Sequence, residues 1–148
     1  MVINAALRAA APDDHARIVA LLMQAGLPAS DITQDRLRDF IVALDAGEVI
    51  GAVGLERYGD HGLLRSLVAA PDWRGHGLGT ALVDAVEARA RSLGVGSLSL
   101  LTETAAPFFA ARGYAAITRT HAPAPVQAST EFSTLCPASS TCMHKTIN

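Results

Sequence analysis

Apolar residues recur along this chain in two periods, one typical of helices and one typical of strands. A stripe with i, i+3, i+4, i+7 spacing predicts an amphipathic helix that begins at Pro12 and ends at Gly26. A longer helix is predicted over residues 77–92, where apolar residues again recur at helical spacing. We expect two short helices, at residues 31–38 and 107–112. The first stripe consists of Ile18, Leu21, Leu22 and Ala25.

Short apolar runs bounded by turn residues predict the strands. The run at residues 40–44 fits a helix or a strand by periodicity alone, and the tight turn Asp45-Ala46-Gly47 after it favours a strand. The predicted order is a strand, two helices, three antiparallel strands, then helix, strand, helix and strand, with a last strand in the tail. This order predicts an α/β fold over residues 1–148, a single domain with a mixed sheet and helices on both faces. The strands are expected at residues 5–9, 40–44, 48–56, 62–69, 97–102, 114–120 and 143–147.

Composition supports one compact domain and argues against several classes of partner. The chain has 148 residues, of which 50% are hydrophobic and 18% are charged, so it can bury one sizeable core. A net charge of −2 without a basic block argues against nucleic acid and anionic membranes as partners. No apolar run approaches membrane-spanning length and no signal peptide is recognised, so we expect a cytoplasmic protein with reduced cysteines. Cys136 and Cys142 have no third ligand nearby in the sequence, so we expect no metal site.

A glycine-rich loop between the strand at residues 62–69 and the long helix is the most informative segment. Gly75, Gly77 and Gly79 follow Arg74 and lead directly into the helix. Glycine lets backbone N–H groups approach a phosphate closely, and the helix N-terminus adds unpaired N–H groups and a partial positive charge. The loop lacks the lysine of a P-loop, and its glycine spacing differs from a dinucleotide-binding fingerprint. The sequence therefore predicts a phosphate site of another kind.

The pattern Arg74-x-x-Gly77-x-Gly79 resembles the acyl-CoA diphosphate loop of the GNAT superfamily of N-acetyltransferases. The segments around Ser66-Leu67-Val68 and Phe108-Phe109 resemble the family's flanking motifs, so the resemblance covers residues 5–119. It implies a mostly antiparallel central sheet, acetyl-CoA as co-substrate without a metal, direct transfer to an amine, and a homodimer. The resemblance implies that the diphosphate is contacted by Arg74, Gly75, His76, Gly77, Leu78, Gly79 and Thr80. It also implies that Leu67, Val68 and Ala69 contact the pantetheine arm and that Thr102 and Phe108 line the cofactor channel.

The resemblance also implies catalytic roles. The backbone N–H of Val68 would polarise the thioester carbonyl, and a base must remove a proton from the attacking amine. Glu56 is the candidate base, and a solvent-facing strand carboxylate is the alternative interpretation. The tyrosine that the family uses to protonate the thiolate is replaced by Phe109, so Tyr114, water or a substrate group is left for that role. We interpret His76 as a bystander of the loop.

Arg65 is the candidate residue for recognising the acceptor. It shares a strand face with Leu67, and a guanidinium pairs bidentately with planar or tetrahedral oxyanions, so it would suit an amino acid carboxylate. A surface salt bridge is the alternative interpretation for Arg65, and a helix-end cap is the alternative to phosphate binding for Arg112.

The tail gives the narrowest indication of a substrate. Residues 124–137 and 143–145 resemble a GNAT subgroup associated with arsenic-resistance gene clusters, whose members acetylate arsinothricin or phosphinothricin. The expected function is thus acetylation of a small amino acid or an amino-acid-like toxin. A non-catalytic acyl-CoA-binding module and a protein N-acetyltransferase are the alternatives.

Overall fold

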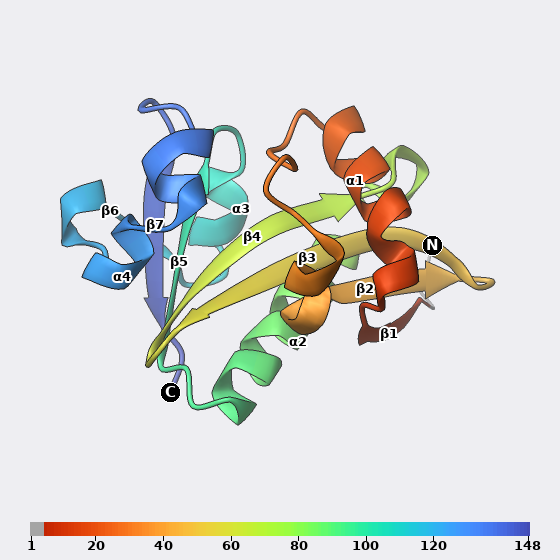
Figure 1. Cartoon of the computed structure of the whole chain (residues 1–148), viewed down its shortest axis with the longest axis horizontal. Coiled ribbons are helices and arrows are strands. Elements are labelled where there is room, and N and C mark those ends of the chain that lie inside the picture. The colour runs from red at the N-terminus through yellow and green to blue at the C-terminus, as the bar shows by residue number, and fades with distance from the viewer. Residues whose placement is uncertain (1–4) are drawn as a thin grey trace. The chain divides into compact units, whose positions relative to one another are not determined.

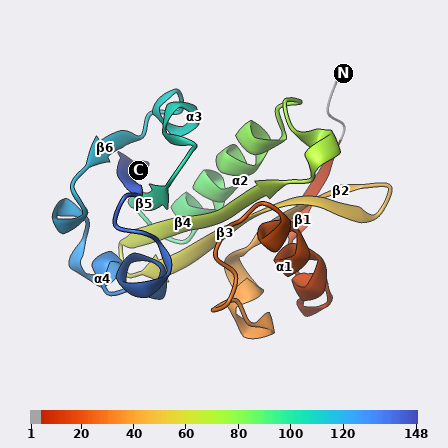
Figure 2. The ribbon, with the colours of Figure 1, turned by 90° about the horizontal axis from the view of Figure 1, so that it is seen from above.

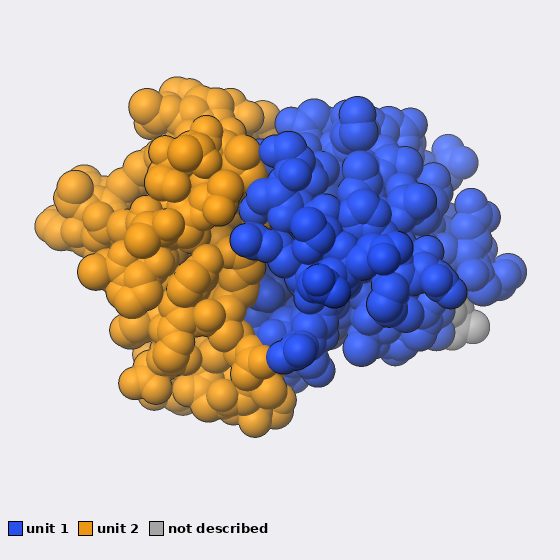
Figure 3. Space-filling model, in the orientation of Figure 1, with its two compact units in different colours: residues 1–55, 66–89 blue, residues 56–65, 90–148 orange. Residues whose placement is uncertain are grey.

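The computed structural model describes residues 5–148 of the chain, and residues 1–4 lie outside the described part (Figure 1). Two compact units can be distinguished in it (Figure 3). Unit 1 holds the chain up to Leu55 together with Ser66–Arg89, and unit 2 holds Glu56–Arg65 and Ala90–Asn148. The single domain expected over residues 1–148 stays a prediction.

Seven strands are hydrogen-bonded in the order β1-β2-β3-β4-β5-β7-β6. β4 pairs in parallel with β5, whereas the β1–β2, β2–β3, β5–β7 and β6–β7 pairs are antiparallel. The predicted α/β fold with a mixed, mostly antiparallel sheet is therefore confirmed. The strands are β1 (Ala6–Ala9), β2 (Ile41–Asp45), β3 (Glu48–Tyr58), β4 (His61–Ala69), β5 (Ser97–Thr102), β6 (Ala115–Ile117) and β7 (Thr141–Thr146).

Four α-helices and several single turns complete the described chain. The helices are α1 (His15–Gln24), α2 (Leu78–Ser92), α3 (Ala106–Ala110) and α4 (Ala124–Gln127). The 3₁₀ turns are η1 (Pro12–Asp14), η2 (Gln34–Asp39), η3 (Pro71–Trp73) and η4 (Arg119–His121), and η5 (Glu131–Leu135) is a turn of π-helix.

Unit 1 packs α1 and α2 on opposite faces of its strands (Figure 2). Three residues of the predicted α1 stripe, Ile18, Leu21 and Leu22, are at most 1% exposed, so the helical periodicity correctly identified the buried face. Close packing also fixes the sequence of β3. A Cβ atom placed on Gly54 would lie 2.4 Å from the ring of the buried Phe40, so only glycine fits at that position.

Unit 2 is centred on β5, which pairs with β7 from Ser97–Thr146 to Thr102–Thr141. A hydrophobic cluster joins this part of the sheet to the segment that follows β6. The cluster consists of Leu63, Ala122, Val126, Phe132 and Cys142, with Tyr58, Leu101 and Ile117 packed against it. The side chain of Arg119 tethers the same segment, because it donates hydrogen bonds to the carbonyl oxygens of Phe132 and Pro137.

Several predicted boundaries were wrong. β3 continues to Tyr58 instead of ending at residue 56, and β4 begins at His61, so the turn between them consists only of residues 59–60. The strand expected at residues 114–120 covers only Ala115–Ile117, because the chain then enters η4, where Thr118 Oγ1 lies 2.9 Å from His121 Nδ1. The short helix expected at residues 31–38 is the 3₁₀ helix η2, which covers Gln34–Asp39, and the last strand begins at Thr141 rather than residue 143. Helix α4 was not predicted.

Candidate functional site

The loop between β4 and α2 has a backbone conformation that requires glycine. Gly75 and Gly77 have φ angles of +79° and +84°, in the left-handed region that side chains rarely adopt. A Cβ atom at either position would meet nothing within 4 Å, so the backbone conformation, rather than crowding, selects glycine here. Leu78, the first residue of α2, is 1% exposed and lies against Gly51 of β3, and this contact anchors the loop.

The loop presents a row of backbone donors. The N–H groups of residues 75–79 follow one another through the turn at residues 74–77 into the first residues of α2, and the carbonyl oxygen of Gly77 accepts the Ala81 N–H at 3.1 Å. The exposed Arg74 is held beside the row by a 3.3 Å hydrogen bond from its Nε atom to the Ala69 carbonyl. Consecutive N–H groups at the positive end of a helix dipole, with a guanidinium beside them, form a site for a polyvalent anion such as a diphosphate.

Two further predicted residues of this segment are partly covered by the protein. His76 and Thr80 are half-buried. The structure therefore brings Arg74 and residues 75–80 together as one segment, in the strand, loop and helix context that the sequence predicted.

Strand β4 bends directly before the segment predicted to contact pantetheine. Ser66 is a buried non-glycine residue with a φ angle of +61°, inside a strand where extended backbone is the norm. The parallel register of β4 with β5 covers three residue pairs and ends at Leu63–Ser99. After the bend, Val68 is buried, whereas Leu67 and Ala69 are half-buried. Val68, whose N–H is the predicted oxyanion donor, thus lies two residues after Ser66, where the strand conformation is irregular.

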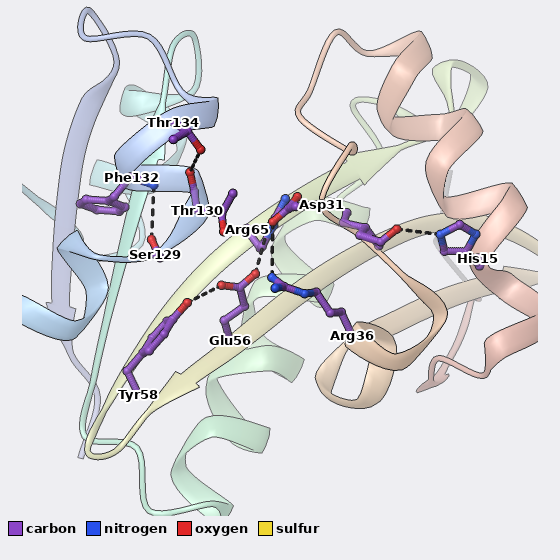
Figure 4. Close-up of polar contacts among 11 residues, drawn as sticks. His15, Asp31, Arg36, Glu56, Tyr58, Arg65, Ser129, Thr130, Phe132 and Thr134 are labelled. Carbon is purple, nitrogen blue, oxygen red and sulfur yellow. Dashed lines mark hydrogen bonds and ion pairs between the residues drawn. The ribbon is translucent and has the colours of Figure 1, made fainter.

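Three residues of unit 2 form a compact polar network that we name the Tyr58–Glu56–Arg65 network (Figure 4). Arg65 Nη1 donates to Glu56 Oε2 at 2.8 Å, and the Tyr58 hydroxyl donates to Glu56 Oε1 at 2.6 Å. The Arg65 side chain has no exposed surface, and that of Glu56 is 15% exposed. The predicted base and the predicted acceptor ligand are therefore each other's partners in a buried ion pair.

Tyr58 is the member of this network that sequence reasoning missed. The signal was present, because residues i and i+2 of a strand share a face, which places Tyr58 beside Glu56 once β3 extends to residue 58.

The aromatic residues near β6 pack together. Tyr114 is 3% exposed and meets the buried Phe109 edge to face, with ring centroids 5.5 Å apart. Arg112 stacks on Phe108 at 3.6 Å and donates to its carbonyl oxygen at 2.7 Å, which is the helix-end alternative that the sequence left open. Thr102 Oγ1 accepts the Ala105 N–H at 2.9 Å and so shapes the turn after β5.

The cysteines of unit 2 are poor nucleophiles in this environment. Burial, together with the nearby Glu131 carboxylate, raises the pKa of Cys136 to about 12, and burial also raises the pKa of Cys142. A thiol with a raised pKa carries little thiolate at neutral pH. Among residues 5–148, no group of three histidine, cysteine, aspartate or glutamate residues is arranged to hold a metal ion. The described helices also include none with the length and apolar character needed to span a bilayer.

A surface pocket of about 470 Å³ lies in unit 1 beside η3, and none of the predicted site residues lines it. Arg17, one of its lining residues, donates to the Val49 carbonyl at 3.1 Å. The lining residues are Arg17, Gln24, Glu48, Ile50, Ala70, Pro71, Asp72 and Trp73.

Comparisons with known proteins agree with this fold. The model of the acetyltransferase (GNAT) family matches residues 7–115. No curated protein matches the chain. N-acetylglutamate synthase from Neisseria gonorrhoeae, solved with coenzyme A and N-acetyl-glutamate, is 19% identical and has a TM-score of 0.85. The match covers 100% of this chain and 36% of the synthase chain. Rv2747 from Mycobacterium tuberculosis, in complex with CoA and NLQ, is 24% identical and has a TM-score of 0.80. The match covers 97% of this chain and 99% of Rv2747.

A third solved structure extends the comparison to another genus. The PaiA N-acetyltransferase from Thermoplasma acidophilum, in complex with coenzyme A, is 13% identical with a TM-score of 0.69 over 97% of this chain and 99% of its own. At these identities the structural matches show the fold alone. The chain spans about a third of the length of the Neisseria synthase.

Proposed function

This chain belongs to the acetyltransferase (GNAT) family, and from that premise we propose that it transfers the acetyl group of acetyl-CoA to the amine of a small amino acid. The observation that carries the proposal is the row of N–H groups at residues 75–79, next to Arg74 and at the start of α2. A diphosphate has the charge and the number of acceptor oxygens that such a row needs.

The proposal assigns the cofactor contacts to the segments named from the sequence. Residues 74–80 would bind the diphosphate, Leu67, Val68 and Ala69 would contact the pantetheine arm, and Thr102 and Phe108 would line its channel. Support for the first assignment comes from the left-handed glycines, Gly75 and Gly77, which leave the loop backbone without a Cβ atom at two positions. No metal is needed for this reaction, because the backbone supplies the electrostatic stabilisation.

In the proposed reaction, the amine first loses a proton and its nitrogen attacks the thioester carbon. The Val68 N–H donates to the carbonyl oxygen as negative charge develops there. The carbon–sulfur bond then breaks, the amide forms, the nitrogen loses its second proton, and the thiolate takes up one proton. Glu56 is the proposed proton acceptor, since an ionised carboxylate accepts protons and its side chain is 15% exposed. Water or Tyr114 is the proposed proton donor to the thiolate.

The Tyr58–Glu56–Arg65 network is the proposed recognition element for the acceptor. An amino acid zwitterion carries one ammonium and one carboxylate, and the network offers one carboxylate and one guanidinium 2.8 Å apart. We propose that the acceptor's ammonium meets Glu56 and that its acidic group competes with Glu56 for Arg65.

Glutamate analogues are the proposed substrates. The Neisseria structure contains N-acetyl-glutamate, the acetylated form of such an acceptor. Arsinothricin and phosphinothricin add a tetrahedral oxyanion that suits a guanidinium. Membership of the subgroup associated with arsenic-resistance gene clusters, a cytoplasmic location and a homodimer belong to the same proposal.

Thiol release tests the proposal. The protein is incubated with acetyl-CoA and with L-glutamate, phosphinothricin, arsinothricin or a lysine-containing peptide, and free CoA thiol is followed. We expect the fastest release with the glutamate analogues. A faster reaction with the peptide would favour a protein N-acetyltransferase.

A non-catalytic acyl-CoA-binding module is the second candidate, and Phe109 favours it. This buried residue replaces the tyrosine that the family uses as an acid, and a phenyl ring has no proton to give. Calorimetric titration with CoA distinguishes the candidates. Tight binding without thiol release from any amine would establish the module, whereas release above the buffer rate would exclude it.

A further inference from the structure

The structure assigns a positioning role to Tyr58. Through Glu56 and Arg65, Tyr58 holds Ser66 in its left-handed conformation. The direction of the β4 backbone after Ser66 depends on that conformation. The inference rests on the proposed function only for its catalytic consequence. It starts from the observation that Ser66 adopts a conformation that its side chain disfavours, at a φ angle of +61°.

A strained residue persists only where its surroundings fix the backbone on both sides. On the N-terminal side, Ser66 is bonded to Arg65, whose side chain has no exposed surface and whose guanidinium is fixed to Glu56 at 2.8 Å. The carboxylate of Glu56 is in turn fixed by the Tyr58 hydroxyl at 2.6 Å. Arg65 therefore cannot rotate about the strand axis without breaking a buried ion pair.

On the C-terminal side, β4 is packed against β3. The Ala70 N–H donates to the Ile50 carbonyl at 2.7 Å, and the Val68 carbonyl oxygen lies 3.0 Å from the position of a Cβ atom on Gly51. Since both flanks are held, the change in strand direction is concentrated in the one residue between them, Ser66.

The bend determines where the N–H groups of residues 67–69 point. In a regular strand, successive N–H groups alternate in direction, and a single residue in the left-handed region breaks this alternation, as in a β-bulge. The parallel β4–β5 register ends before Ser66, at Leu63–Ser99. The N–H of Val68 takes its direction from this bend, which makes the network a positioning device for the proposed oxyanion donor.

Glycine at position 66 separates this role from a merely structural one. If Tyr58→Phe weakens the network, Ser66 can relax out of the left-handed region, and kcat should fall about tenfold while the KM for acetyl-CoA stays unchanged. Ser66→Gly removes the cost of that region, so Y58F/S66G should recover at least half of the lost kcat. Ala46→Gly is the matched control, because Ala46 is the other described non-glycine residue with a positive φ, +50°, and it lies in the β2–β3 turn.

The experiment measures kcat, both KM values and urea unfolding for Y58F, S66G, A46G and the two double variants. We expect rescue of kcat by S66G and none by A46G. We also expect non-additive unfolding free energies for Y58F with S66G, and additive ones for Y58F with A46G. Wild-type kcat in Y58F, a loss confined to the acceptor KM, or equal rescue by A46G would overturn the inference. If the wild-type protein releases no thiol, the proposed function fails, and additivity in unfolding would then overturn the positioning role on its own.

Discussion

A carboxylate at position 77 tests the diphosphate assignment most directly. Gly77 has a φ angle of +84° and an open Cβ direction, so aspartate there adds backbone strain and one negative charge without a steric clash. The strain costs about 1–2 kcal/mol of folding free energy. Repulsion between the new carboxylate and a phosphate about 4 Å away adds about 1 kcal/mol in water and about 4 kcal/mol at an effective dielectric constant of 20.

Two controls separate these effects. G77N has nearly the same shape without the charge, and asparagine tolerates the left-handed region better than most residues. G94D introduces the same charge and strain at Gly94, after α2, where φ is +80° and the Cβ direction is also open. We expect all three variants to be destabilised in urea unfolding, and G77D alone to bind CoA at least fivefold more weakly than G77N, as about 1 kcal/mol of repulsion requires.

Isothermal titration with CoA at low salt and at 0.5 M salt is the assay. Because mobile ions screen the repulsion, the difference between G77D and G77N should shrink at high salt. Equal CoA affinity of G77D and G77N at low salt, or an equal loss in G94D, would refute the assignment of the diphosphate to residues 75–79.

Three further predictions concern the charged and thiol groups. Arg65→Met should lower the free energy of unfolding by about 3–5 kcal/mol, because it leaves the partly buried Glu56 carboxylate without its cation; a loss below 1 kcal/mol in urea unfolding would contradict the buried ion pair. Arg8 donates to Asp14 at 2.8 Å and lowers the pKa of that carboxyl below 3.8. A carboxyl whose pKa is lower in the folded than in the unfolded protein stabilises the folded state at pH values above its unfolded pKa. This contribution to the free energy of unfolding should be lost as the pH falls from about 4. In acid-unfolding curves the Asp14→Asn variant should therefore lose less free energy of unfolding than the wild type over the same pH range. Cys136, with its pKa of about 12, should react with a disulfide reagent at pH 8 far more slowly than a free cysteine, and rapid labelling in native protein would refute its environment.

The parts of the fold that follow from local sequence were predicted well. The loop at residues 74–79 was identified because glycines between an apolar strand and an amphipathic helix are a local signal, and two of these glycines have positive φ angles. The α1 stripe was identified because a buried helix face repeats every three or four residues.

The parts that depend on pairing between distant residues were not predicted. The predicted strand at residues 48–56 did not include Tyr58, so its hydrogen bond to Glu56 could not be foreseen. The pairing of Glu56 with Arg65 depends on the same hairpin. Serine carries no sequence signal for a left-handed conformation, so the bend at Ser66 became visible only in the structure.

The segment after β6 was predicted least well. Helix α4 was not predicted, although Pro125 lies in its first turn, a position that proline favours. Its fold comes from packing of Val126 and Phe132 into the unit 2 cluster, which periodicity over so few residues cannot indicate.

The tether formed by Arg119 has a practical consequence for engineering. The guanidinium of Arg119 holds the carbonyl oxygens of Phe132 and Pro137, so the chain is secured at the first of the exposed residues 137–139. Pairing of Thr141 with Thr102 secures it again where β7 begins. A short peptide epitope or a fluorophore attachment point inserted at Ala138 would extend into solvent from two fixed ends, a type of surface position that commonly tolerates insertions.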